Sequence, residues 1–103
     1  MAQVRWTPQS LSDIEHITEY IARDSEVYAS IQTERFFEAV KILEDQVKTG
    51  RIVPEIDDSS IREVILGFYR IIYRVVNDEQ VDILTVHHSR RDPESNKFLK
   101  SFL

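Results

Sequence analysis

The chain has 103 residues, of which 42% are hydrophobic and 30% charged, with no cysteine and a formal net charge of −5. The missing cysteines exclude disulfides and thiolate metal sites, and no apolar run approaches the roughly 20 residues that cross a membrane. We therefore expect one cytoplasmic domain over residues 1–103, without a signal peptide, a membrane partner or any general attraction for nucleic acid.

The N-terminal part of the chain predicts a strand followed by a helix. Residues 3–6 suit a short strand. Thr7 followed by Pro8 is typical of a helix start, because threonine caps free backbone N–H groups and proline has none to leave unpaired. A first helix is predicted over residues 9–23, where apolar residues recur at helical spacing. These residues are Leu11, Ile14, Ile17 and Ile21.

A second helix is predicted to form an αα-hairpin with the first. Ser25 is expected to cap it, and the helix is expected to continue to about Thr49, with Gly50 as its C-terminal stop. One apolar stripe follows the expected helical spacing. It consists of Phe36, Val40, Leu43 and Val47.

The second half of the chain predicts a loop and then three antiparallel strands. Residues 51–60 contain Pro54 and an Asp-Asp-Ser-Ser run, a composition typical of a loop. Residues 61–91 are rich in β-branched and aromatic side chains, and two turn signals divide them into a meander. The turns are expected at Leu66 and Gly67 and at residues 77–80.

These elements, with a short last helix expected over residues 92–103, predict an α+β fold. Along the middle strand, successive side chains point to opposite faces. The set Tyr69, Ile71, Tyr73 and Val75 is expected to pack on the helices. The opposite set forms a half-open face and is a candidate binding surface: Phe68, Arg70, Ile72, Arg74 and Val76.

Motifs spread over nearly the whole chain carry a family resemblance. They are Trp6-Thr7 before the first helix, Arg-Ile-Val-Pro-Glu at 51–55, Tyr-Arg-Ile-Ile-Tyr-Arg at 69–74 and His-Ser-Arg-Arg at 88–91. In these motifs and in element order the chain resembles the RelE/ParE toxin superfamily. The resemblance implies a toxin of a bacterial type II toxin–antitoxin pair. Its helical hairpin would pack on a curved antiparallel sheet, as in small microbial ribonucleases, and a cognate antitoxin would neutralise it in a hetero-oligomer.

The resemblance leaves two targets open, DNA gyrase for a ParE-like toxin and ribosome-bound messenger RNA for a RelE-like one. Metal-free RNA cleavage needs proton-transfer groups and cations near the scissile phosphate. For a RelE-like toxin the matching residues are Arg70, either Arg90 or Arg91, and either His88 or His87, with Glu55 or Glu63 as a carboxylate base.

The ParE-like alternative is favoured by what the chain lacks. The first strand of the meander has no lysine, no tyrosine follows Tyr73, and residues 1–60 carry a net charge of −6. In this interpretation four arginines bind a protein instead of a scissile phosphate. They are Arg62, Arg70, Arg74 and Arg91.

The same residues also admit less specific interpretations. Each arginine of the meander can instead pair with Glu63, Asp82 or the acidic loop. His87 and His88 are adjacent on a strand, so their side chains should point to opposite faces and share no metal ion. We expect neither a metal nor another cofactor.

Overall fold

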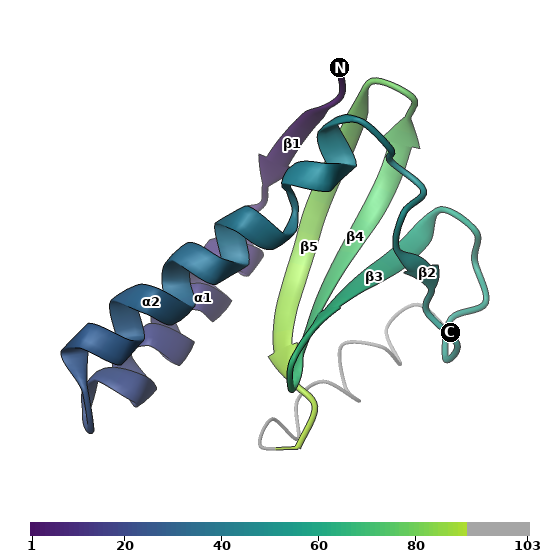
Figure 1. Cartoon of the computed structure of the whole chain (residues 1–103). Coiled ribbons are helices and arrows are strands. Elements are labelled where there is room, and N and C mark those ends of the chain that lie inside the picture. Colours follow the sequence, from purple (N-terminus) through teal and green to yellow (C-terminus); the bar gives the residue numbers. More distant parts are fainter. Residues whose placement is uncertain (91–103) are drawn as a thin grey trace.

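The computed structural model of the chain describes residues 1–90, so Arg91 and the helix expected over residues 92–103 lie outside the described part. The described part is α+β, with two helices side by side against one face of a five-stranded sheet (Figure 1). The predicted N-terminal strand, helical hairpin and meander are present in the expected order.

The sheet is mixed instead of antiparallel throughout, and it gains a short edge strand. Its strands are β1 (Gln3–Trp6), β2 (Arg51–Ile52), β3 (Ile61–Leu66), β4 (Tyr69–Asn77) and β5 (Gln80–His88). They follow the spatial order β1-β5-β4-β3-β2, with β1 parallel to β5 and the other neighbours antiparallel. The loop predicted over residues 51–60 is wrong at its start, because the first two residues pair with β3.

Both predicted helix starts are confirmed by capping hydrogen bonds. α1 (Pro8–Ala22) follows Thr7, and α2 (Glu26–Ala39) follows Ser25. In each case the side-chain oxygen of the cap accepts a hydrogen bond from a backbone N–H in the first turn. Such a cap satisfies a donor that the helix itself leaves unpaired, which contributes about 1 kcal/mol.

The second helix ends earlier than predicted, at Ala39 instead of near Thr49. The chain continues as a short 3₁₀ helix, η1 (Lys41–Glu44), and the Glu44 carbonyl accepts a hydrogen bond from the Ala2 N–H at 2.6 Å. In a continuing α-helix that carbonyl would bond four residues ahead. The contact with Ala2 therefore closes the end of η1, while the first three members of the predicted stripe stay buried: Phe36, Val40 and Leu43.

Side chains of β4 divide between the two faces of the sheet as predicted. The helix-facing set is buried in the main core, as seen for Tyr69, Ile71 and Tyr73. On the opposite face Ile72 is also buried, because the segment after β2 brings Val53 against it. Arg74 and Val76 are exposed. The second face is thus half open, as expected: Val53 covers it at Ile72, and it is exposed at Arg74 and Val76.

The turn between β3 and β4 consists of two residues, Gly67 and Phe68. Gly67 has φ +59°, a conformation that side chains resist and that the first central residue of a type II′ turn requires. Phe68 therefore lies at the tip of the hairpin instead of inside the strand. Its side chain is 53% exposed.

Gly50 marks a close approach between backbone and side chain, not the end of a helix. Its N–H donates to the Tyr73 hydroxyl at 2.9 Å, and that hydroxyl donates to the Val47 carbonyl at 2.8 Å. Burial raises the pKa of Tyr73 above its ordinary value. A β-carbon at position 50 would lie 2.5 Å from the Glu63 carbonyl oxygen.

The edge of β5 is closed by a helix side chain where β1 ends. β1 pairs with residues 80–83 of β5. Beyond them, the Asp13 carboxylate on α1 accepts a hydrogen bond from the Val86 N–H at 3.0 Å and another from the Thr85 hydroxyl. A helix carboxylate thus satisfies the strand donor that β1 does not reach.

Candidate partner-binding site

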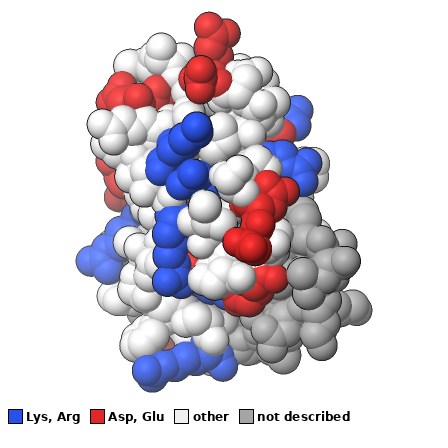
Figure 2. Space-filling view, turned by 90° about the vertical axis from the view of Figure 1, so that its right-hand side faces the viewer, with Lys and Arg blue, Asp and Glu red and all other residues white. Residues whose placement is uncertain are grey.

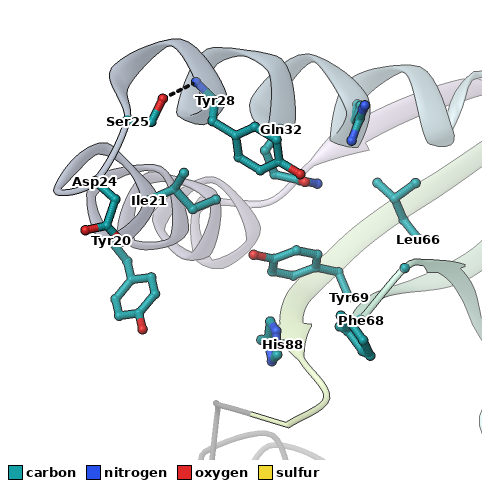
Figure 3. A pocket seen from close by; sticks show the side chains of 12 residues that line it. Tyr20, Ile21, Asp24, Ser25, Tyr28, Gln32, Leu66, Phe68, Tyr69 and His88 are labelled. Carbon is teal, nitrogen blue, oxygen red and sulfur yellow. Dashed lines mark hydrogen bonds between the residues drawn. The ribbon is translucent and has the colours of Figure 1, made fainter.

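A groove separates the tip of the helical hairpin from the turn between β3 and β4. Its volume is about 480 Å³. Figure 3 shows Tyr28 and Gln32 reaching from α2 toward Tyr69 on β4, with His88 beside that ring. The Tyr69 ring is held edge-on against Phe36 at 4.9 Å and against His88 at 5.0 Å between centroids.

The lining of this groove combines aromatic and polar groups. Tyr28 is 51% exposed, whereas Gln32 and Tyr69 are nearly buried, so the groove has a fixed floor and an accessible rim. Tyrosine offers apolar area together with a hydroxyl that hydrogen-bonds, and it is enriched in protein–protein interfaces. The arrangement suits an amphipathic segment of a protein.

The hairpin tip beside the groove presents an aromatic ring in a fixed position. The Phe68 carbonyl accepts hydrogen bonds from the Ser89 N–H at 2.7 Å and the Ser89 hydroxyl at 2.8 Å. The Arg90 guanidinium lies over the Phe68 ring, 4.5 Å from its centroid, in a cation–π contact. The Arg90 N–H donates to the His88 Nδ1 at 3.1 Å. Arg90 and His88 thus meet at this tip.

Arg70 takes part in an ion-pair network with Glu55 and Glu63. Its Nε donates to Glu63 at 2.7 Å, and its two terminal nitrogens donate to both Glu55 carboxylate oxygens at 2.8 and 2.9 Å. Glu63 also accepts from the Nε of Arg51. The Glu63 side chain has 0% exposure, and that of Arg70 has 14%.

These contacts shift the pKa values of Arg70 and Glu55. Hydrogen bonds from Arg70 hold the pKa of Glu55 below its ordinary value, and the bond to Glu55 is the main reason that the pKa of Arg70 is raised. Both groups therefore carry full charge at neutral pH. Every nitrogen of Arg70 already donates to a carboxylate.

The other predicted arginines have separate surroundings. Arg62 donates to three backbone carbonyls, those of Ser59, Lys48 and Gly50, and so joins two loops. Arg74 is exposed and forms no ion pair within residues 1–90. The predicted binding set of arginines therefore does not form one cluster with common partners. Arg91, its fourth member, lies outside the described residues.

His87 and His88 point to opposite faces, as predicted. The ring of His88 packs on Tyr69, whereas the Nε2 of His87 lies 3.2 Å from the Thr85 hydroxyl and the side chain is buried. Within residues 1–90, no three histidine, aspartate or glutamate side chains are grouped so as to hold a metal ion. Nor is any described helix long and apolar enough to span a bilayer.

Two features of the site were not predicted from the sequence. The groove forms because the tip of the helical hairpin stands away from the β3–β4 turn. No short sequence pattern predicts the distance between these two segments. The double pairing of Arg70 is predicted in part, because Glu63 and the acidic loop are expected as partners of the arginines. The register of β3 and β4 brings Glu63 near Arg70, whereas Glu55 reaches the same guanidinium from the loop after β2.

Comparisons with known proteins agree with this architecture. A family model described as "ParE toxin of type II toxin-antitoxin system, parDE" matches residues 4–93. Among solved structures, a chain from the "Chromosomal ParDE TA system from P. aeruginosa" aligns with a TM-score of 0.71 and 21% identity. The alignment covers 85% of this chain and 96% of that one, and at this identity it shows a common fold. A search of curated proteins gives no match.

The family match covers β1, both helices and the whole sheet. The expected resemblance to the RelE/ParE superfamily is confirmed, and the family model specifies the ParE branch. This chain belongs to the ParE toxin family of type II toxin–antitoxin systems.

Proposed function

We propose that this toxin arrests growth in the cytoplasm by inhibiting DNA gyrase, and that a cognate antitoxin neutralises it in a hetero-oligomer. The observation that carries this choice of target is the pairing of Arg70 with Glu55 and Glu63. A nuclease needs a cation that is available to the transition-state phosphate. Here, in the free toxin, the guanidinium of the matching arginine is already paired with two carboxylates.

The alternative function is RelE-like cleavage of messenger RNA on the ribosome, and parallel assays separate the two. Purified toxin is expected to block DNA supercoiling by gyrase and to leave messenger RNA intact in a translating extract. The gyrase proposal fails if supercoiling proceeds at a large molar excess of folded toxin. Messenger RNA cuts that disappear in Arg70→Ala and in the exposed-site variant Arg90→Ala would instead establish the nuclease.

We also place the antitoxin in the groove between the helix tip and the β3–β4 turn. Tyrosine is enriched among the few interface residues whose truncation costs more than about 1 kcal/mol of binding free energy. Tyr28→Ala is therefore expected to weaken antitoxin binding roughly tenfold, measured by calorimetry with the cognate antitoxin.

Val27 supplies the matched control for Tyr28. It precedes Tyr28 on α2, is 73% exposed and does not line the groove. Val27→Ala is expected to bind the antitoxin like the unchanged toxin. Equal affinities for both variants and the unchanged toxin would place the antitoxin elsewhere.

A further inference from the structure

The far side of the Arg70 network opens into a second hollow. Its volume is about 450 Å³. Two arginines, one carboxylate, one hydroxyl and two exposed apolar side chains line it: Arg51, Arg70, Glu55, Ser89, Ile65 and Phe68. Figure 2 shows that basic side chains follow a line over the side of the molecule where β2 and β3 lie, next to a group of acidic ones.

The charges around this hollow balance only when Glu55 is counted. The buried Glu63 carboxylate lies between Arg51 and Arg70 and offsets one of their two positive charges. One positive charge remains, and the Glu55 carboxylate offsets it through two parallel hydrogen bonds to Arg70. Glu63 is fixed inside the sheet. Glu55 stands on a loop with 43% of its side chain exposed.

We propose that this hollow is a carboxylate-binding site for an acidic side chain of a protein partner, and that Glu55 occupies it in the free toxin. The inference rests on the proposed function in one respect, that the toxin acts by binding a protein. Replacing the Glu55 carboxylate with a partner's carboxylate keeps the charge balance and the two-point geometry that a guanidinium prefers.

The surroundings favour a protein carboxylate over the phosphates of a nucleic acid. Asp57 and Asp58 follow Glu55 closely along the chain. Their negative charges repel a nucleic acid, which carries many phosphates, more strongly than they repel a single carboxylate. Ile65 and Phe68 are 49% and 53% exposed at the hollow and offer apolar area to a peptide segment. A partner needs such extra contacts, because it competes with an intramolecular carboxylate of high effective concentration.

The exchange is tested with small monoanions on the isolated, folded toxin. The probes are N-acetylglutamate amide, which has one carboxylate, and dimethyl phosphate. Binding is followed by the NMR signal of the Arg70 Nε–H. Glu55→Ala is expected to bind the carboxylate probe at least roughly tenfold more tightly than the unchanged toxin, since the internal competitor is gone. The control Glu34→Ala removes an exposed carboxylate from α2 and is expected to change nothing.

Each other result contradicts the proposal. Tighter binding of dimethyl phosphate than of the carboxylate probe would make this a phosphate site and point to nucleic acid. No shift of the Arg70 signal with either probe would show that the hollow accepts no anion. Glu55→Gln keeps the size of the side chain and replaces the alanine variant if that one unfolds. The measurement uses toxin alone, so its outcome is independent of the gyrase assay.

Discussion

Replacing Gly50 with alanine is expected to lower the free energy of unfolding by about 3 kcal/mol or more, the upper part of the range for overpacked cores. The new β-carbon would lie 2.5 Å from the Glu63 carbonyl oxygen and 2.7 Å from the Tyr73 ring. Neither neighbour retreats easily, because Glu63 sits between β2 and β4 and Tyr73 is fully buried. Urea unfolding followed by Trp6 fluorescence measures the loss.

Gly67 provides the control for this substitution. A β-carbon there meets no atom within 4 Å, but φ is +59°, so alanine suffers only backbone strain. That strain costs about 1–2 kcal/mol. A loss at Gly50 no larger than the loss at Gly67 would show that the close approach is not a structural constraint.

Replacing Glu63 with alanine is expected to destabilise the fold by about 3 kcal/mol, as when one partner of a buried ion pair is removed. The substitution leaves Arg70 nearly buried with Glu55 as its remaining carboxylate, and it removes the partner of Arg51. The matched variant Glu55→Ala removes a half-exposed carboxylate from the same guanidinium. Its cost should be about 1 kcal/mol or less.

The double variant Glu63→Leu with Arg70→Leu tests the reason for that difference. If an unpaired charge causes the loss, the double variant should lose less stability than the sum of the losses in the single variants Glu63→Leu and Arg70→Leu. Denaturant midpoints of the single and double variants give the comparison. Additive losses, or equal losses for Glu63→Ala and Glu55→Ala, would contradict the role assigned to the buried carboxylate.

Features that depend on neighbouring residues were predictable from the sequence. The caps Thr7 and Ser25 are predictable because each forms its hydrogen bond with a backbone N–H only three residues further along the chain. Alternation along β4 likewise follows from strand geometry. The end of α2 was predicted wrongly, since the 3₁₀ hydrogen bond from the Leu43 N–H to the Val40 carbonyl replaces the α-helical pattern there, and no glycine or proline marks that point.

The candidate site was predictable in its residue types but not in their roles. The arginines of the meander were identified, yet their partners come from distant segments: Glu55 from a loop for Arg70, and three loop carbonyls for Arg62. Whether a cation is available to a ligand depends on such long-range contacts. A single sequence does not encode them in any local pattern.

The parallel pairing of β1 with β5 has a consequence for how the toxin is made. β1 is synthesised first, but it can pair only after β5, the last described strand, has been synthesised. The Arg5–Asp82 ion pair, at 2.9 Å, joins these two strands. Contacts so distant in sequence form late. β5 also lies between β1 and β4, so a nascent chain that stops before residue 80 lacks the strand that joins β1 to the rest of the sheet. Truncated chains that end before β5 are therefore expected not to form the complete fold.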